Sequence, residues 1–129
     1  MLLVKTKLLP SKIHGMGLFA DELISKGTVI WKFTSGFDLK FSKEQIKKFP
    51  KQVQEYLENY CWLSKKSGKY CFSSDNGKYF NHSKNPNSLS AYYEDEEEVV
   101  TKAIRDIKKG EEITDDYSTF EKGFKENWK

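Results

Sequence analysis

YFNHSKNPNS, at residues 79–88, is the segment of this chain that best predicts its fold. Asparagine and proline favour turns, and the residue before a proline is kept out of the helical region, so we expect a loop here. The aromatic pair Tyr79 and Phe80 precedes this loop and can anchor it on a hydrophobic base. Loops that a rigid scaffold holds in this way often carry binding residues. The alternative is an ordinary surface turn rich in Asn and Ser.

The composition indicates a single domain. A chain of 129 residues, of which 15% are aromatic, can bury a core without metal or disulfide staples. The mean hydropathy of −0.73 and the lack of a long apolar run predict no membrane span. Cys61, Cys71 and the two histidines show no zinc-ligand spacing, which favours a reducing compartment and predicts no metal. The segment MLLVKTKLLP lacks a signal-peptide core, so we expect an intracellular protein of the cytoplasm or nucleus.

Strands and tight turns are expected on both sides of a helical region. The patterns predict strands at 2–9, 28–33, 69–72, 88–93 and 99–104. Gly15 and Gly17 would let the backbone bend and approach a ligand closely, although the pair could equally form a hairpin corner. Between the strands, Ser42 and Gln45 form a capping-box pattern and Pro50 suits the first turn of a second helix. We therefore expect a helical insert at about 37–65, with its lysines on a solvated face.

The C-terminal third carries acidic and aromatic patterns. EDEEE at 94–98 is expected to be an exposed hairpin loop and not a metal site. GEEITDDY at 110–117 then mixes β-branched and acidic residues and ends on Tyr117. Phe120, Phe124 and Trp128 fall four apart, which predicts a short aromatic helix at about 118–129 that docks on the core or lines a site.

The order of three motifs resembles the SET-domain protein lysine methyltransferases. These motifs are GMGLFA at 15–20, NHSKNPN at 81–87 and AIRDIKKGEEITDDY at 103–117, and the resemblance covers about residues 5–120. It implies a β-rich α+β fold of several short twisted sheets, with the C-terminal segment threaded as a pseudoknot. The chain would be a single SET domain over residues 1–129, without cysteine-rich flanking modules, and the region 37–65 would be its variable insert.

The resemblance also implies S-adenosyl-L-methionine as the cofactor. The backbone of Met16 and Gly17 would contact its methionine part, and Lys78 would pair with its carboxylate, where the family often has an arginine with a bidentate fork. From the central loop, the Asn81 amide oxygen would accept from the cofactor amine and His82 would meet the adenine through its backbone. The complete set of expected cofactor-binding residues is Met16, Gly17, Lys78, Tyr79, Asn81, His82, Phe120 and Trp128.

Tyr117 matches the catalytic tyrosine that the family places beside the methyl-transfer channel. Its hydroxyl and neighbouring carbonyl oxygens would orient the methyl group and the substrate amine, so that alignment and preorganised electrostatics supply most of the rate. A tyrosine of ordinary pKa is a poor general base at neutral pH, and we assign it no such role.

Three departures from the family pattern matter. Lys84 stands where a cysteine often follows NHS, and no cysteine cluster follows Tyr117, so the family's zinc-bearing flap is missing. Phe120, Phe124 and Trp128 are the residues left to cover the adenine. Asp115 stands where the family's Phe or Tyr tunes how many methyl groups are added, which leaves the product open.

The resemblance implies an enzyme that methylates the side-chain amine of lysine in a protein substrate. A histone or another basic protein is the candidate substrate, and a second copy of the chain is a candidate partner that would complete the substrate groove. No membrane partner is expected, and a net charge of only +3 argues against a nucleic-acid binder. The alternative is a SET-fold module that has lost turnover and binds a protein, because a fold alone does not define an activity.

Overall fold

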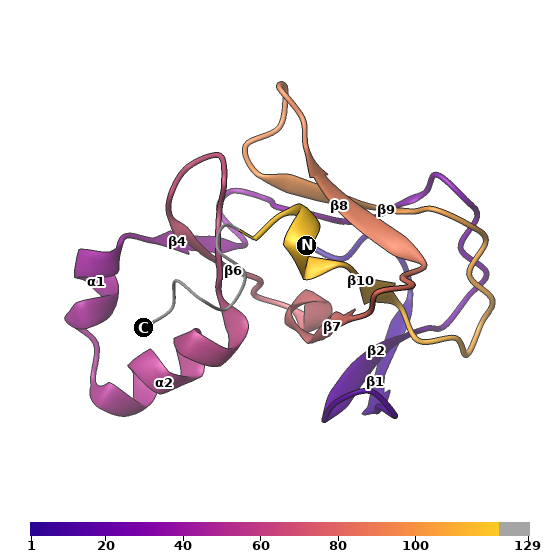
Figure 1. Cartoon of the computed structure of the whole chain (residues 1–129), viewed down its shortest axis with the longest axis horizontal. Helices are drawn as coiled ribbons and strands as arrows, with labels where there is room; N and C mark the ends of the chain where they lie inside the picture. Colours follow the sequence, from indigo (N-terminus) through magenta and orange to yellow (C-terminus); the bar gives the residue numbers. More distant parts are fainter. Residues whose placement is uncertain (122–129) are drawn as a thin grey trace.

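Short β-strands in several small sheets form most of the regular structure (Figure 1). The structure is a computed structural model, and it describes residues 1–121. An N-terminal hairpin pairs β1 (Thr6–Pro10) antiparallel with β2 (Met16–Ala20). A three-stranded antiparallel sheet has the order β3 (Val29–Lys32), β9 (Val99–Ala103), β8 (Ser88–Tyr92). The predicted β-rich α+β fold is confirmed.

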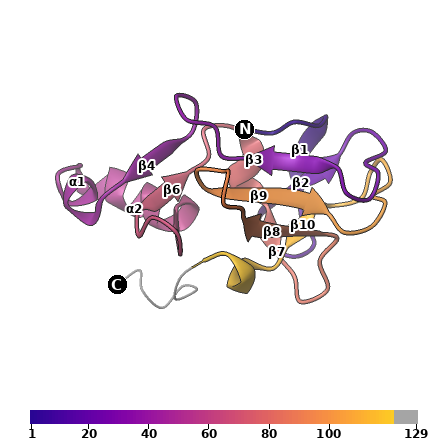
Figure 2. The ribbon, with the colours of Figure 1, turned by 90° about the horizontal axis from the view of Figure 1, so that it is seen from above.

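The predicted helical insert is itself attached to a small sheet. Its helices are α1 (Lys43–Lys47) and α2 (Lys51–Tyr60), and the capping box of Ser42 and Gln45 is present at the start of α1. Strands β4 (Leu39–Phe41) and β5 (Trp62–Leu63) flank the helices and both pair with β6 (Tyr70–Phe72). Figures 1 and 2 place α1 and α2 at one end of the molecule, with the β1–β2 hairpin toward the other.

Two very short strands join the segments that carry the decisive motifs. Strand β7 (Asn81–His82) runs parallel to β10 (Thr114–Asp115), with Asn81 opposite Thr114 and Asp115 opposite His82. Parallel neighbours need a long crossover connection, and here the β8–β9 hairpin provides it. A 3-10 turn, η1 (Asn76–Tyr79), precedes β7, and a second, η2 (Tyr117–Thr119), follows β10. This pairing brings the C-terminal segment into the centre of the fold, as the predicted threaded arrangement requires.

The core consists of three apolar clusters. One lies under the N-terminal hairpin and includes Leu18, Ile30 and Ile113, and another lies under the helices around Ile46 and Leu57. The cluster between them is built mainly of aromatic rings: Trp31, Phe33 and Phe120 are buried with Cys71 and Val99, and Phe80, Tyr92, Trp62 and Tyr117 pack against them. The central loop therefore does rest on a hydrophobic base.

The acidic run at 94–98 connects β8 and β9 as expected, but it is not uniformly exposed. Glu98 is only 1% exposed, and its carboxylate accepts a hydrogen bond of 2.6 Å from the hydroxyl of Ser64. The ammonium of Lys40 lies 3.4 Å from Glu98 and 2.8 Å from Glu97. The prediction was wrong for Glu98 because Lys40 on β4 and Ser64, just after β5, satisfy the buried charge. Composition cannot reveal such partners.

Most of the predicted C-terminal aromatic helix lies outside the described residues. Residues 117–119 form a single 3-10 turn, and Phe120 is buried in the central aromatic cluster. Phe124 and Trp128 belong to the part of the chain that the structure does not describe. Within residues 1–121, no helix is both long enough and apolar enough to cross a membrane.

Candidate active site

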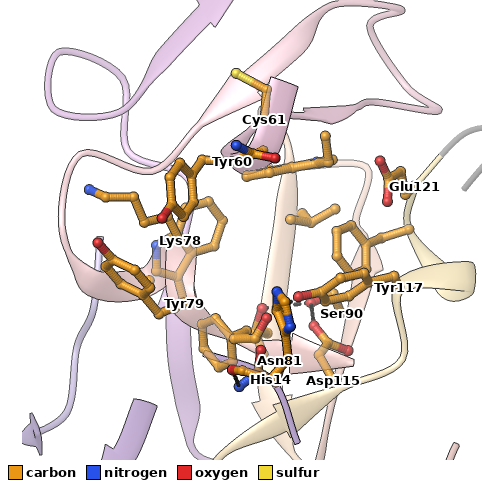
Figure 3. A pocket seen from close by; sticks show the side chains of 18 of the residues that line it. His14, Tyr60, Cys61, Lys78, Tyr79, Asn81, Ser90, Asp115, Tyr117 and Glu121 are labelled. Carbon is orange, nitrogen blue, oxygen red and sulfur yellow. Dashed lines mark hydrogen bonds between the residues drawn. The ribbon is translucent and has the colours of Figure 1, made fainter. Parts of the chain in front are cut away.

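A cavity of about 730 Å³ lies where the central loop, the C-terminal segment and the end of α2 meet. Figure 3 shows residues from these segments converging on it. Its volume is within the range of small-molecule sites, and its wall mixes aromatic rings with a few polar groups. It is lined by His14, Gly15, Met16, Trp31, Glu58, Asn59, Tyr60, Cys61, Trp62, Gly77, Lys78, Tyr79, Phe80, Asn81, Ser90, Val99, Thr101, Asp115, Tyr117, Phe120 and Glu121.

The asparagine-rich loop holds the C-terminal segment in place. The side-chain amide of Asn87 donates to the carbonyl of Glu112 at 2.8 Å, and its oxygen accepts from the N–H of Thr114 at 2.9 Å. The hydroxyl of Ser88 donates to the carbonyl of Thr114 at 2.7 Å. These side-chain bonds take the place of regular β-sheet hydrogen bonds on one side of β10. The loop that we expected to bind a ligand therefore also holds β10 in position. Sequence reasoning missed this role of Asn87.

Asn81 has its amide nitrogen fully engaged. Nδ2 donates to the carbonyls of His14 at 3.1 Å and Met16 at 3.2 Å and to Oε2 of Glu112 at 2.8 Å. Among residues 1–121, no hydrogen bond reaches its oxygen, Oδ1. Asn81 is 7% exposed and lines the cavity. The side chain is therefore fixed with a hydrogen-bond acceptor as its free polar atom.

Glu112 connects the glycine pair to the central loop. Its carboxylate accepts from the hydroxyl of Ser11 at 2.7 Å and from Asn81. A Cβ on Gly17 would lie 2.4 Å from Oε2 of Glu112, so any larger residue here would have to displace that carboxylate. Gly15, with a φ of 47°, closes the β1–β2 hairpin. The hairpin-corner interpretation is thus correct for Gly15, whereas Gly17 lies within β2 opposite Leu9. There it permits close packing against a carboxylate that sequence reasoning had not singled out.

Tyr117 is held by contacts with both motif segments. Its hydroxyl donates to the carbonyl of Phe80, and its backbone N–H donates to Nδ1 of His82 at 3.1 Å. The ring centroids of Tyr117 and His82 lie 5.3 Å apart. Burial, and after it the nearby carboxylates of Asp115 and others, raise the pKa of Tyr117 above its ordinary value. A hydroxyl with this pKa stays protonated at neutral pH and acts as a donor, not as a base.

Lys78 supplies a positive charge at the cavity wall. Its ammonium donates to the carbonyl of Asp75 at 3.2 Å and lies 5.1 Å from the ring centroid of Phe72 and 5.8 Å from that of Tyr79. The rings of Tyr79 and Tyr60 meet edge to face at 5.5 Å, which continues the aromatic surface onto the end of α2. This part of the wall offers a cation beside flat apolar rings.

Three aromatic side chains build a second wall. Trp62 meets Trp31 at 5.5 Å and Phe120 at 5.9 Å between ring centroids, in both cases edge to face. Phe120 also meets Tyr117 at 5.9 Å. The indole N–H of Trp62 is buried and has no hydrogen-bond partner among the described residues. Sequence reasoning missed Trp62, and it placed Trp31 only in a predicted strand, without a role in the site.

The structure brings most of the predicted site residues together. Tyr117 and five of the predicted cofactor contacts, Met16, Lys78, Tyr79, Asn81 and Phe120, line the cavity. Gly17 and His82 do not line it: Gly17 faces Glu112, and His82 lies behind Tyr117 and accepts its N–H. The prediction for Trp128 falls outside the described residues. Asp115, noted in the sequence only as a departure, lines the cavity with Ser90 and Thr101.

Comparison with known proteins establishes the family. The model of the SET domain matches residues 15–118, so the chain belongs to the SET-domain family. A search of the curated proteins finds no match. Among solved structures, a Plasmodium falciparum protein assigned as a histone methyltransferase is 22% identical, with a TM-score of 0.63 over 90% of this chain and 95% of that one.

Two further structures similar to this chain come from the Polycomb Repressive Complex 2 of Chaetomium thermophilum. A humanized mutant bound to the inhibitor GSK126 has a TM-score of 0.66, and an apo form with two substitutions in Ezh2 has a TM-score of 0.69. Both are 25% identical to this chain over 91% of its length, and the chain spans 15% of each of those chains. The family and these neighbours agree with the SET fold predicted from the motifs.

Proposed function

We propose that this protein transfers a methyl group from S-adenosylmethionine to the side-chain amine of a lysine in a protein substrate. The observation that carries the proposal is the cavity itself. Residues from the glycine hairpin, the 78–81 segment and the C-terminal motif, which are distant in sequence, line one pocket. Membership of the SET-domain family and the likeness to histone methyltransferases support this assignment.

The chemistry of the lining residues fits the cofactor. Lys78 offers a cation for its carboxylate, and the Asn81 oxygen offers an acceptor for its amine. The rings of Tyr60, Tyr79 and Phe120 offer apolar faces for the adenine. When bound, S-adenosylmethionine would supply an electrophilic methyl group on a positively charged sulfur.

The chain's own residues would orient the reacting groups and exclude water. The contact between the Tyr117 hydroxyl and the Phe80 carbonyl fixes a donor and an acceptor side by side at the cavity wall. A lysine side chain that enters this aromatic space would lose its hydration, which favours the neutral amine. Such alignment and preorganised dipoles are the main sources of rate in group transfer without covalent catalysis.

The proposed substrate is a basic protein, of which a histone is one example. Two carboxylates, Glu58 and Glu121, line the cavity together with Asp115 and would favour a positively charged segment at its mouth. A peptide array incubated with labelled S-adenosylmethionine and read by mass spectrometry would identify the accepted lysine. Light scattering with and without that peptide would test whether a second copy of the chain completes the groove.

Tyr117→Phe tests the proposed enzyme against a binding module without turnover. The variant loses one hydroxyl but keeps the ring that packs on His82 and Phe120. We expect cofactor affinity to change little and single-turnover methyl transfer to fall more than about tenfold, which corresponds to about 1.4 kcal/mol of transition-state stabilisation. Equal rates would reduce Tyr117 to a packing residue. Tight cofactor binding by the parent protein without transfer to any lysine would favour the binding module.

Asn81→Ala tests the cofactor site, and Asn87→Ala is its matched control. Both changes remove an amide that bonds the segment around Glu112, so both should lower thermal stability. Asn81 lines the cavity, whereas Asn87 is buried outside it. Calorimetry should therefore show a loss of about 1.5–3 kcal/mol in cofactor binding for the Asn81 variant alone. Equal affinity losses in the two variants would mean that Asn81 acts only through the fold.

A further inference from the structure

Asp115 is a buried acid in the cavity wall for which the described residues offer no cation. It is 2% exposed, accepts a hydrogen bond from the hydroxyl of Ser90, and accepts one of 2.8 Å from the N–H of Asp116. None of the ion pairs within residues 1–121 includes it. Buried carboxylates are costly unless a positive group pairs with them. Glu98 shows how a buried carboxylate is usually satisfied, because the ammonium of Lys40 lies 3.4 Å from it.

The hydroxyl groups next to Asp115 are oriented toward it. The oxygens of Ser90 and Thr101 lie 2.6 Å apart, and the hydroxyl of Ser90 donates to Asp115. Because a hydroxyl has one proton, Ser90 must accept from Thr101. The chain Thr101 to Ser90 to Asp115 therefore directs its dipoles at the carboxylate, and all three residues line the cavity. This arrangement aims hydrogen-bond donors at a carboxylate that lines the cavity.

The cavity consequently has two ends of opposite charge. Figure 3 shows Lys78 on one side and Asp115, beside Ser90 and Tyr117, on the other. In the proposed function, Lys78 pairs with the cofactor carboxylate, which leaves the Asp115 end for the second substrate. A lysine side chain reaches an active site as an ammonium ion, and a hydrogen bond between an ammonium ion and a carboxylate is stronger than one between neutral groups.

We propose that Asp115 binds the ammonium group of the substrate lysine and accepts its proton. This inference rests on the proposed function and identifies the residue that prepares its substrate. One N–H bond of the ammonium breaks, the electron pair stays on nitrogen, and the proton moves to a carboxylate oxygen of Asp115 and later to solvent. The neutral amine then has the lone pair that methyl transfer requires.

The electrostatic surroundings support proton transfer in this direction. Burial, together with the neighbouring charge of Asp116, raises the pKa of Asp115 to about 7 against the hydrogen bonds that lower it. Burial of an amine lowers its pKa, so the two values approach one another inside the cavity. The other titratable groups beside Asp115 are Asp116 and Tyr117 on its own segment and His82 opposite it on β7. The carboxylates of Glu112 and Glu121 act on the adjacent Tyr117.

The test uses Asp115→Asn, with Asp116→Asn as its control. Asp116 neighbours Asp115 and loses the same charge, but it bonds Ser118 and does not line the cavity. The probe is n-butylammonium chloride, which reproduces the lysine side chain, and n-butanol is its uncharged counterpart. Titrations of the full chain at pH 7.5, followed by the backbone NMR signals of Ser90 and Tyr117, give the dissociation constants.

We expect butylammonium to bind the parent protein and the Asp116 variant equally, and the Asp115 variant at least about tenfold more weakly, as for the loss of a charge-assisted hydrogen bond. Butanol should not distinguish the three proteins. Butylammonium should also lower the pH at which the Asp115 carboxyl carbon titrates. Equal butylammonium affinity in the Asp115 and Asp116 variants would overturn the proposal. If Asp115→Asn does not fold, Asp115→Ser gives the same comparison.

Cofactor binding, measured separately by calorimetry with S-adenosylmethionine, distinguishes this inference from the proposed function. Binding of S-adenosylmethionine without a response to butylammonium would reject the role of Asp115 and leave the methyltransferase assignment intact. A butylammonium response that depends on Asp115, in a protein that neither binds S-adenosylmethionine nor transfers methyl groups, would support a cation site and reject the methyltransferase.

Discussion

Replacement of Asp115 by Asn should change how the stability of the protein depends on pH. Burial raises the pKa of this carboxyl from the ordinary aspartate value to about 7. A group with a raised pKa in the folded state contributes its full stability below the unfolded pKa of about 3.9, and that contribution is lost as the pH rises through the folded value. The parent protein should therefore lose stability relative to Asp115→Asn between about pH 4 and pH 7.

The size of this effect follows from the two pKa values. They differ by about 3, and each unit corresponds to 1.36 kcal/mol, so the relative stability should fall by about 4 kcal/mol across this range. The slope should be about 1.4 kcal/mol per pH unit and should level off above about pH 7. Asn and Asp also differ in their hydrogen bond with Ser90, but the stability difference from this bond does not depend on pH. This bond therefore changes the stability difference between the two proteins by the same amount at every pH and leaves its slope with pH unchanged.

Urea denaturation of both proteins from pH 4.5 to 8.5 measures the difference directly. Asp116→Asn is again the control, because the hydrogen bonds from Ser118 are the main cause that lowers the pKa of Asp116. A lowered folded pKa contributes stability above the unfolded value that is lost only as the pH falls through the folded one. The Asp116 variant should therefore be less stable than the parent by a constant amount above about pH 4. A constant difference for Asp115→Asn between pH 5 and 8 would refute the reasoning.

Two glycine substitutions test the packing around the site. Gly17→Ala would place a methyl carbon 2.4 Å from Oε2 of Glu112, which must then leave its partners, and thermal melting should show a loss of about 1–3 kcal/mol. Gly77→Ala would place one 2.5 Å from the indole of Trp31, and a changed tryptophan emission together with a similar loss of about 1–3 kcal/mol is expected. Unchanged melting temperature and emission would show that Glu112 and Trp31 can move aside without lowering the free energy of unfolding.

The family and about half of the strands could be predicted from the sequence because they depend on short-range patterns. Alternation and β-branched residues identified β3, β6, β8 and β9 to within about a residue at each end. The capping box of Ser42 and Gln45 depends on residues three apart, so sequence spacing alone predicts it. The order of three motifs was enough to predict one site with Tyr117 and Asn81 in its wall.

The arrangement within the site depends on contacts that span large sequence separations. Ser11 meets Glu112 from 101 positions away, and Ser90 meets Asp115 from 25 positions away. The burial of Glu98 follows from Lys40 on β4 and from Ser64 just after β5, which are 58 and 34 positions away in the sequence. No local sequence pattern predicts such partners. An acidic residue in a turn is expected to be exposed, and only residues that are distant in sequence but near in the fold decide whether it is buried and hydrogen-bonded.

Asp115 shows most clearly which features the sequence predicts and which depend on the tertiary structure. From the sequence alone it was an acid at a position where the family has an aromatic ring, with no indication of its environment. Its role as a charged wall of the cavity follows from the parallel pairing of β10 with β7 and from the hydroxyl of Ser90 on β8. Local patterns thus determined the motifs and the strands β3, β6, β8 and β9. Tertiary packing decided which polar groups are buried together, because desolvation and hydrogen bonding depend on what surrounds a side chain in space.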